Sequence, residues 1–280
     1  MTRYPLSIQF KAGREVMERF GMMTEAPTRL VLEAVDVVAD RVVSAHAPYS
    51  TGCARLSIAD LDDAVREVSI DQLGRYIEAA ATLFPNLQKV NMHSSPRRWV
   101  SGGRTLVGDY NRLIDGVRHL AGIAGRYGLE LVLENNRTYW EGVPGRVPAD
   151  RVNREAQNEY FGTAPEEWMQ IQADVDRSNV FLCLDPSHAC TYAHTFVEVE
   201  KRRERMMAFL NAGEALRHVH WNGNDLESVK GRQDMHMCIG ADTLPRAFHR
   251  AVKGLDATLL LEHFYSVEEL EAELGFIERL

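Results

Sequence analysis

The stretch Val180–His188, VFLCLDPSH, decides the fold. Its first five residues form a continuous apolar run, which is typical of a short strand covered on both faces, as in a parallel sheet. Asp185 ends this run, and His188 follows three residues later. Both side chains can bind a metal ion. The stretch therefore predicts a buried strand with metal-binding side chains directly beyond its end.

Short apolar runs of this kind recur along the chain, and longer amphipathic stretches separate them. The other predicted strands are Leu6–Phe10, Arg41–Ala45, Leu87–Met92, Leu129–Leu133, Leu216–Val219 and Ala257–Leu261. Helical patterns cover residues 58–83, 109–127, 165–175, 196–210, 244–252 and 267–277. We expect more than one helix in 58–83, because Ser69-Ile70-Asp71-Gln72 has the form of a capping box. Alternating strands and helices predict an α/β protein with a (β/α)8 TIM barrel.

The predicted barrel has seven clear strands where a complete one needs eight. Either the eighth strand lies near Thr28–Leu32, or the barrel lacks one N-terminal βα unit. No linker or break in composition divides the chain, so residues 1–280 are expected to form one domain. The segment 138–164 is polar, rich in Gly, Pro and Arg, and long for a loop. Long loops in compact domains are usually functional or mobile.

Composition excludes several classes of protein. The 280 residues are 45% hydrophobic and 26% charged, which excludes disordered and low-complexity chains. The net charge is −8, from 32 basic and 40 acidic residues, so a broad basic face that coats nucleic acid is not expected. No apolar run approaches the ~18 residues of a membrane span, and the N-terminal residues do not have the pattern expected of a secretory signal. The expected location is cytoplasmic.

Metal-binding residue types follow six of the predicted strands directly. They are His46, His93, Glu134, Asp185, His220 and Glu262. One such residue alone is more often part of a turn, but six in succession point to a common site, because the carboxyl ends of barrel strands converge on one mouth. His188, Asp234 and His236 add further ligands nearby. Five histidines and four carboxylates suit two or three divalent ions, with Zn²⁺ expected ahead of Mn²⁺ or Fe²⁺.

Several short motifs resemble endonuclease IV, a zinc-dependent family within the xylose isomerase-like TIM-barrel superfamily. The motifs are His46-Ala47-Pro48-Tyr49, Asn91-Met92-His93, Glu134-Asn135-Asn136, Asp185-Pro186-Ser187-His188, His220-Trp221-Asn222, and Asp234-Met235-His236 followed by Ile239-Gly240. Glu262 corresponds to the last carboxylate of that family. Met235 stands where the family has an arginine. Ser50 and Thr51 stand where it has apolar residues that penetrate DNA.

The resemblance implies a partition of the nine ligands among three ions. The first ion would bind His46, His93 and Glu134. The second would bind Glu134, Asp185, His220 and Glu262, and the third would bind His188, Asp234 and His236. Glu134 and Glu262 are the expected catalytic residues. Substrate would be bound by Tyr49, Arg97, Arg98, Arg137 and Asn222.

Three functions are compatible with these residues. The first is a phosphoesterase in which metal-activated hydroxide attacks a phosphate ester, with abasic DNA as one candidate substrate. The second is an isomerase or epimerase of a sugar or sugar phosphate, with Glu134 and Glu262 as acid and base beside a divalent metal. The third is a biosynthetic oxidase with two or three irons. The expected partner is an anionic molecule, either DNA or a small phosphorylated or sugar compound, and no membrane; the oligomeric state is not predicted.

Overall fold

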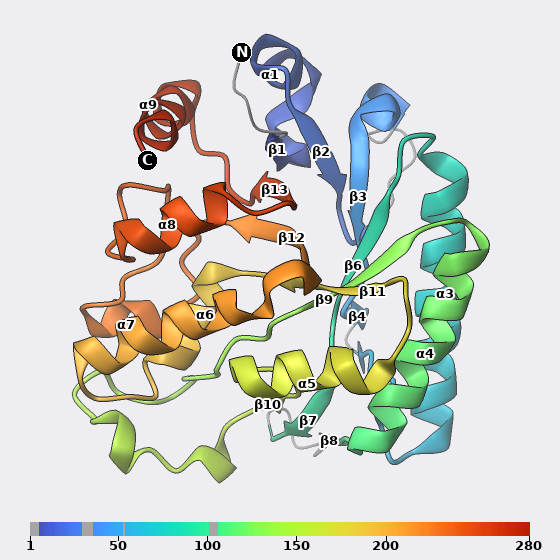
Figure 1. Ribbon diagram of the computed structural model, residues 1–280. Coiled ribbons are helices and arrows are strands. Elements are labelled where there is room, and N and C mark those ends of the chain that lie inside the picture. Colours follow the sequence, from blue (N-terminus) through green and yellow to red (C-terminus); the bar gives the residue numbers. More distant parts are fainter. Residues whose placement is uncertain (1–5, 30–35, 53, 101–105) are drawn as a thin grey trace.

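Eight parallel strands close into a barrel in the computed structural model, which describes residues 6–29, 36–52, 54–100 and 106–280. Around the barrel the strands are β1 (Leu6–Gln9), β13 (Thr258–Leu261), β12 (Leu216–Trp221), β11 (Val180–Leu184), β9 (Glu130–Glu134), β6 (Lys89–His93), β3 (Val42–His46) and β2 (Met23–Ala26). β1 pairs with both β2 and β13, which closes the ring. The predicted (β/α)8 barrel is confirmed (Figure 1).

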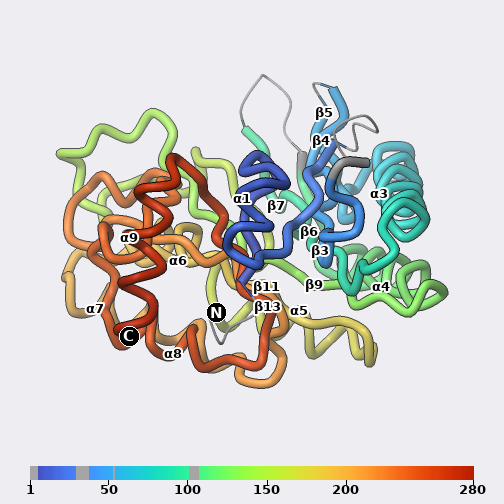
Figure 2. The backbone as a smooth tube through the Cα atoms, turned by 90° about the horizontal axis from the view of Figure 1, so that it is seen from above, coloured from blue at the N-terminus to red at the C-terminus, as the bar shows by residue number. Residues whose placement is uncertain are grey.

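Helices surround the strands (Figure 2), with α3 and α4 on one side and α7, α8 and α9 on the other. Their bounds are α1 Gly13–Phe20, α3 Asp63–Leu83, α4 Tyr110–Arg126, α5 Pro165–Val175, α6 Pro186–Ala193, α7 Val199–Ala208, α8 Arg246–Lys253 and α9 Val267–Glu278. Short 3-10 helices include η1 (Phe10–Ala12), η2 (Asp36–Arg41), η4 (Ala149–Arg151), η5 (Arg154–Ala156), η6 (Phe209–Ala215) and η7 (Val229–Arg232). Within the described ranges, no helix has the length and apolar character needed to cross a membrane.

The eighth strand is β2, and two of its buried side chains are polar. Thr24 and Glu25 are almost fully buried, so the strand lacks the apolar run that marks the others. The expectation of a strand near Thr28–Leu32 is wrong for Thr28, which lies in a bend after β2; Leu30, Val31 and Leu32 lie outside the described residues. The alternative of a barrel that lacks one N-terminal unit is also wrong.

Residues 58–83 hold one long helix, α3, so the expectation of more than one helix is wrong. Asp62 caps this helix, because its carboxylate accepts hydrogen bonds from the backbone N–H groups of Ala64 and Val65. Ser69, the expected cap of a second helix, lies inside α3 and donates its hydroxyl to the Val65 carbonyl at 2.7 Å. The same hydroxyl accepts the N–H of Ser57 at 2.9 Å. Ser69 therefore joins the helix to the preceding loop instead of starting a new helix.

Two small sheets lie beside the barrel. A hairpin of β4 (Ser50–Thr51) and β5 (Ala54–Arg55) follows β3. A three-stranded sheet joins β7 (Pro96–Trp99) to β8 (Leu106–Val107) and to β10 (Glu159–Tyr160). The pairing of β7 with β10 folds the segment 138–164 back onto the chain that follows β6. Loops from two adjacent barrel strands are thereby held together.

Trp140 fixes the start of the segment 138–164. The guanidinium groups of Arg154 and Arg232 lie 4.0 Å and 4.2 Å from the centre of its ring. Its indole N–H donates to the Thr191 carbonyl in α6 at 3.0 Å, and Arg232 donates to the Val147 carbonyl at 2.9 Å. Two cations against one indole give a strong contact when the indole is buried, as Trp140 is. The loops after β9 and β12 are therefore locked to each other.

Candidate metal centre

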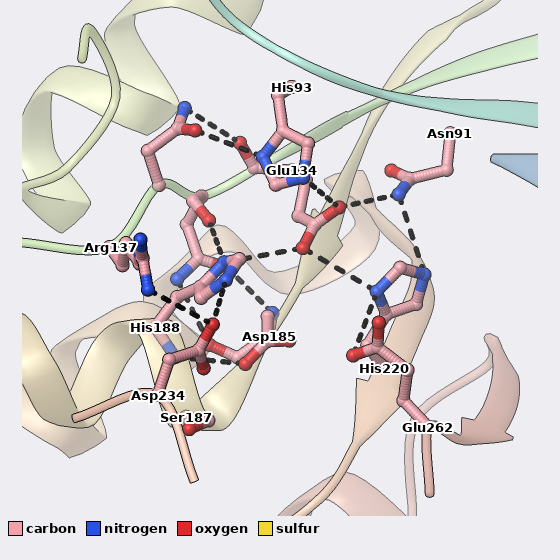
Figure 3. Close-up of polar contacts among 12 residues, drawn as sticks. Asn91, His93, Glu134, Arg137, Asp185, Ser187, His188, His220, Asp234 and Glu262 are labelled. Carbon is pink, nitrogen blue, oxygen red and sulfur yellow. Dashed lines mark hydrogen bonds and ion pairs between the residues drawn. The ribbon is translucent and has the colours of Figure 1, made fainter. Parts of the chain in front are cut away.

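The nine predicted ligands converge on the mouth of the barrel. Figure 3 shows His93, Glu134, Asp185, His188, His220, Asp234 and Glu262 among them. Eight of them form three groups in which one ligand atom from each residue lies within 4.8 Å of the others. The groups are His46, His93 and Glu134; Glu134, Asp185 and His220; and Asp185, His188, Asp234 and His236. The ninth, Glu262, lies 3.3 Å from both His220 Nδ1 and His236 Nδ1. The mouth opens into a cavity of about 290 Å³.

Glu134 lies at the centre of the arrangement and is almost fully buried. Its Oε2 lies 3.4 Å from His46 Nε2 and 3.5 Å from His93 Nε2. Its Oε1 lies 3.2 Å from His188 Nδ1 and 3.5 Å from His220 Nδ1. The two oxygens thus face different histidines, which is the arrangement that a carboxylate bridging two ions requires.

The group around Asp234 lies at the outer side of the mouth. Asp234 Oδ2 lies 3.2 Å from His188 Nε2, and Asp234 Oδ1 lies 3.0 Å from His236 Nε2. Asp185 Oδ2 approaches His236 Nε2 at 3.7 Å. Asp185 also caps α6 by accepting the His188 N–H at 2.9 Å. One aspartate therefore both starts the helix that carries His188 and faces the ligands.

Glu25 is a site residue that the sequence pattern did not indicate. Its Oε1 lies 3.2 Å from His220 Nε2, and its Oε2 lies 3.0 Å from His218 Nε2. All three side chains are buried. A carboxylate on one imidazole nitrogen is how metal-binding histidines are commonly oriented toward an ion at the other nitrogen. A search for polar residues at the end of a short, polar strand could have found Glu25.

The far nitrogen of His220 fits a metal ligand. His220 Nδ1 is buried and has no hydrogen-bond partner within the described part of the chain. It points toward Glu134 Oε1 at 3.5 Å and toward Glu262 Oε2 at 3.3 Å. A buried nitrogen left unpaired between two carboxylates is costly unless an ion or a proton occupies the space. The residues present therefore fit a divalent cation.

Burial and neighbouring charges shift the pKa values of the carboxylates in the mouth in opposite directions. Burial alone would raise the pKa of Glu134, but His93 and His220 outweigh it and hold the pKa well below its usual range. Burial would likewise raise the pKa of Glu262, but His220 and His236 lower it to about 2. Asp185 differs, because burial raises its pKa to about 7. Glu134 and Glu262 are therefore anionic at neutral pH.

The pKa values of the histidines depend on burial and on these anions. Burial lowers the pKa of His93 to about 4, so this ring is neutral. Burial would also lower the pKa of His220, yet the surrounding anionic groups raise it well above its usual value. For His236, Glu262 and Asp185 overcome burial and raise the pKa to about 10. Without an ion, protons compensate the negative charge, so metal binding must displace protons.

Asparagine side chains hold the ligands in place. Asn91 donates to Glu134 Oε2 at 2.5 Å, and Asn136 Oδ1 contacts His93 Nδ1 at 3.0 Å. Asn222 was predicted to bind substrate, but it is fully buried and does not line the cavity. It donates to Asp185 Oδ2 at 3.1 Å and to Glu262 Oε2 at 3.3 Å. Its position suits orientation of the ligands.

Aromatic and basic side chains form the rim of the cavity. Tyr49 and Arg137, both predicted to bind substrate, line it together with Arg55, Tyr139 and Tyr160, which the sequence pattern did not indicate. Tyr49 is 45% exposed, and its ring meets that of His93 edge-on at 5.9 Å. Arg55 is placed by the β4–β5 hairpin, over the rings of Tyr49 and Trp99.

Arg97 and Arg98 lie outside the mouth cavity. Arg97 pairs with Glu159 and Glu167, and Arg98 pairs with Glu159. These residues line a neighbouring cavity of about 450 Å³, which shares Arg137 and Tyr139 with the mouth. Arg97 and Arg98 are predicted to bind phosphate, but the carboxylates of Glu159 and Glu167 compete with a phosphate for them.

Comparison with known proteins gives the family. Residues 11–280 match the family described as xylose isomerase-like TIM barrel. The chain belongs to this family. Among solved structures, it is similar to a D-tagatose 3-epimerase-like protein, with a TM-score of 0.66, 19% identity and 98% of each chain covered. It is also similar to D-psicose 3-epimerase of Clostridium cellulolyticum H10, with a TM-score of 0.64, 13% identity and 98% of each chain covered.

One curated relative is the uncharacterized protein MJ1311 of Methanocaldococcus jannaschii, 26% identical over 196 residues. The match covers 70% of this chain, and it spans about half, 54%, of that relative's length. Family membership bears out the superfamily part of the predicted resemblance. The two solved structures carry epimerase names, so they give no support to its endonuclease IV part.

Proposed function

We propose that this family member is a divalent-metal-dependent isomerase or epimerase acting on a small sugar or sugar phosphate. The observation that carries the proposal is the pair Glu134 and Glu262, whose oxygens lie 3.5 Å and 3.3 Å from the same nitrogen of His220. The cavity beside them, about 290 Å³, is at the lower end of the range for small-ligand sites. The epimerase names of similar folds support the same class.

The ion for this reaction would be held by Glu134, Asp185, His220 and Glu262. A divalent ion in such a site polarises carbonyl and hydroxyl oxygens of a bound sugar. Glu25 fixes the His220 ring from behind, and Asn222 holds Asp185 and Glu262. These contacts leave the ligand oxygens and His220 Nδ1 directed into the mouth.

Glu134 and Glu262 would carry the proton between carbon atoms or between the two faces of one carbon. Both are anionic at neutral pH because the neighbouring histidines lower their pKa values. In isomerisation, one carboxylate removes the proton next to the sugar carbonyl and, now protonated, returns it to the neighbouring carbon; in epimerisation, the other carboxylate first takes up a proton from solvent and delivers it to the opposite face. Tyr49, Tyr139 and Tyr160 supply apolar faces against which a sugar ring can pack.

The rim favours a phosphorylated or otherwise anionic sugar. Arg55 and Arg137 both line the cavity. The guanidinium of Arg55 lies 4.4 Å from the centre of the Trp99 ring. The nearest carboxylates to Arg137 are at 3.5 Å and 3.9 Å, longer than a strong ion pair. Two arginines at the entrance can therefore bind a terminal phosphate.

A second candidate is a metal-dependent phosphoesterase. The two outer ligand groups favour it, because a single-ion isomerase leaves His46, His93, His188, Asp234 and His236 without a metal-binding role. Two or three adjoining ions would suit activation of water and neutralisation of a phosphate. Glu134 and these five residues provide six ligands for further ions. The number of ions bound per chain therefore tests this alternative.

The test combines metal analysis with two assays. Protein purified without chelators is analysed for metal identity and number. It is then incubated in deuterated water with ketoses and ketose phosphates, and separately with phosphodiesters and abasic duplex DNA. We expect deuterium to enter a ketose beside its carbonyl, with loss of exchange in Glu134→Gln and Glu262→Gln. Glu130→Gln, at the other end of β9, is the matched control. Ester cleavage without exchange would establish the second candidate instead.

A further inference from the structure

A separate group of metal-binding side chains lies outside the barrel mouth. Cys238, His263 and Glu273 each place one ligand atom within 4.8 Å of the others. Cys238 belongs to the loop after β12, His263 follows β13, and Glu273 belongs to α9. Three elements distant along the chain therefore bring a thiol, an imidazole and a carboxylate to one point. We propose that this group is a second metal site, specific for a thiophilic divalent ion such as Zn²⁺.

The imidazole of His263 is oriented as a metal ligand would be. Its Nε2 lies 2.8 Å from both carboxylate oxygens of Glu273. Its Nδ1 is buried and has no hydrogen-bond partner within the described part of the chain. The residue is only 4% exposed, so water does not readily satisfy this nitrogen. An ion held together with Glu273 would bind at Nε2, the nitrogen that faces the carboxylate, on the other side of the ring from Nδ1.

Glu273 has one oxygen available to an ion. Its Oε1 also accepts the backbone N–H of Ile239 at 2.5 Å, whereas Oε2 contacts only the imidazole. A thiolate, a carboxylate and a neutral imidazole around a divalent ion sum to zero charge, which suits a buried site. Ligand atoms of tetrahedral zinc lie roughly 3.3 to 3.8 Å apart. Closing the site therefore requires the three ligand atoms, now within 4.8 Å of one another, to reach this spacing, with His263 Nε2 and Glu273 Oε2 moving apart from 2.8 Å.

An ion can reach this group from solvent. A cavity of about 600 Å³ is lined by Cys238 and Glu273 together with Glu269 and Tyr265. Two carboxylates in the lining attract a cation toward the thiol. The three ligands leave a fourth position for water, as zinc sites with three protein ligands do. The nine predicted ligands of the mouth are imidazoles and carboxylates, so the two sites differ in chemistry.

The site adjoins the loop that carries Asp234 and His236. Cys238 is two residues after His236, and the Tyr265 hydroxyl donates to the His236 carbonyl at 2.6 Å. The Tyr265 ring is stacked on that of His263 at 5.8 Å. An ion bound by Cys238 and His263 would thus brace this loop from behind. Its role would be structural support of the mouth rather than contact with substrate.

Cobalt substitution tests the proposal independently of any catalytic activity. Metal-free protein is titrated with Co²⁺, and the thiolate-to-cobalt charge-transfer absorption in the near ultraviolet is recorded. We expect this band in the native chain, its loss in Cys238→Ser, and its retention in Cys190→Ser and Cys183→Ser. His263→Gln should weaken Zn²⁺ binding at least about tenfold. A band that is absent from the native chain, or that survives in Cys238→Ser, would overturn the proposal.

A second measurement on the unmodified sequence covers the case in which a variant does not fold. Cys238 is half-buried, whereas Cys183 and Cys190 are fully buried. Native metal-free protein is treated with a thiol-alkylating reagent, with and without Zn²⁺, and the labelled cysteines are identified by mass spectrometry. Zn²⁺ should protect Cys238 from alkylation. Equal labelling in both samples would count against the site.

Discussion

Glu25 Oε1 lies 3.2 Å from His220 Nε2, and this contact joins the second strand of the barrel to its seventh in chain order. Both side chains are buried, so the carboxylate fixes the ring and leaves Nδ1 to face Glu134 and Glu262. The centre therefore depends on a residue that does not itself reach the cavity.

Replacing Glu25 should change how stability depends on pH. Burial opposes its ionisation, but His220 and His218 hold the pKa of Glu25 well below its usual value of about 4.5. A carboxylate with a lowered folded-state pKa adds stability above the unfolded pKa, and this is lost as pH falls through the folded pKa. Metal-free Glu25→Gln should therefore be less stable than the native chain at pH 6, and the gap should narrow below pH ~4.5. Urea denaturation across this range measures it, and a constant gap would contradict the assigned pKa.

Substitution of Glu134 should release more metal ions than substitution of Asp234. Glu134 faces four histidines, whereas Asp234 faces two. If all three ligand groups are occupied, Glu134→Gln should lose two ions per chain and Asp234→Asn one. The turnover rate of Glu134→Gln should fall at least about a hundredfold, because general acid–base groups contribute at least that much. Elemental analysis of the two variants checks the difference. Equal losses would show that Glu134 does not bridge.

Substitution of the rim arginines should discriminate between charged and neutral substrates. Arg55→Ala or Arg137→Ala removes a charge-assisted contact, which is worth about ten- to a hundredfold in binding. KM for a sugar phosphate should rise by about this factor, while KM for the unphosphorylated sugar changes little. Arg97→Ala is the matched control, because Arg97 pairs with Glu159 and Glu167 outside the mouth. The same rise for both substrates would exclude phosphate recognition by the rim.

Truncation of Trp140 should release the segment 138–164. The indole is buried and contacts the guanidinium groups of Arg154 and Arg232, so Trp140→Ala should lower the free energy of unfolding by about 3 to 5 kcal/mol. Limited proteolysis should show new cleavage within 138–164. Tyr127→Ala, at a 45% exposed position, serves as control and should change stability by less than about 0.5 kcal/mol. An unchanged cleavage pattern would show that other contacts hold the loop.

The barrel was predictable to the extent that its signals were local. Seven strands carry apolar runs, and each ligand strand ends in a polar residue that interrupts its run, as Asp185 does after Val180–Leu184. β2 escaped this criterion because Thr24 and Glu25 occupy its buried positions. Their polar groups are satisfied by the Ile8 carbonyl and by His218 and His220, which no short window of sequence can reveal.

The substrate-binding residues were harder to predict than the ligands. Arg97 and Arg98 follow His93 closely, yet their carboxylate partners lie about 60 to 70 residues further along the chain. Arg55 had no motif around it, and only the β4–β5 hairpin places it at the rim. The ligands share a position at strand ends, whereas the rim is assembled from loops whose course depends on tertiary contacts.

The closed ring of strands also sets the time at which the centre can form during synthesis. Glu25 lies on β2, and Glu262 directly follows β13, which pairs with β1 and so joins the two ends of the barrel sequence. The side chain of Gln9 donates to the Glu262 carbonyl at 2.8 Å across this junction. Because contacts this distant in sequence form late, the last ligand strand takes its place only after the other strands of the barrel have been synthesised. Loading of the complete metal centre must therefore follow closure of the ring between β1 and β13.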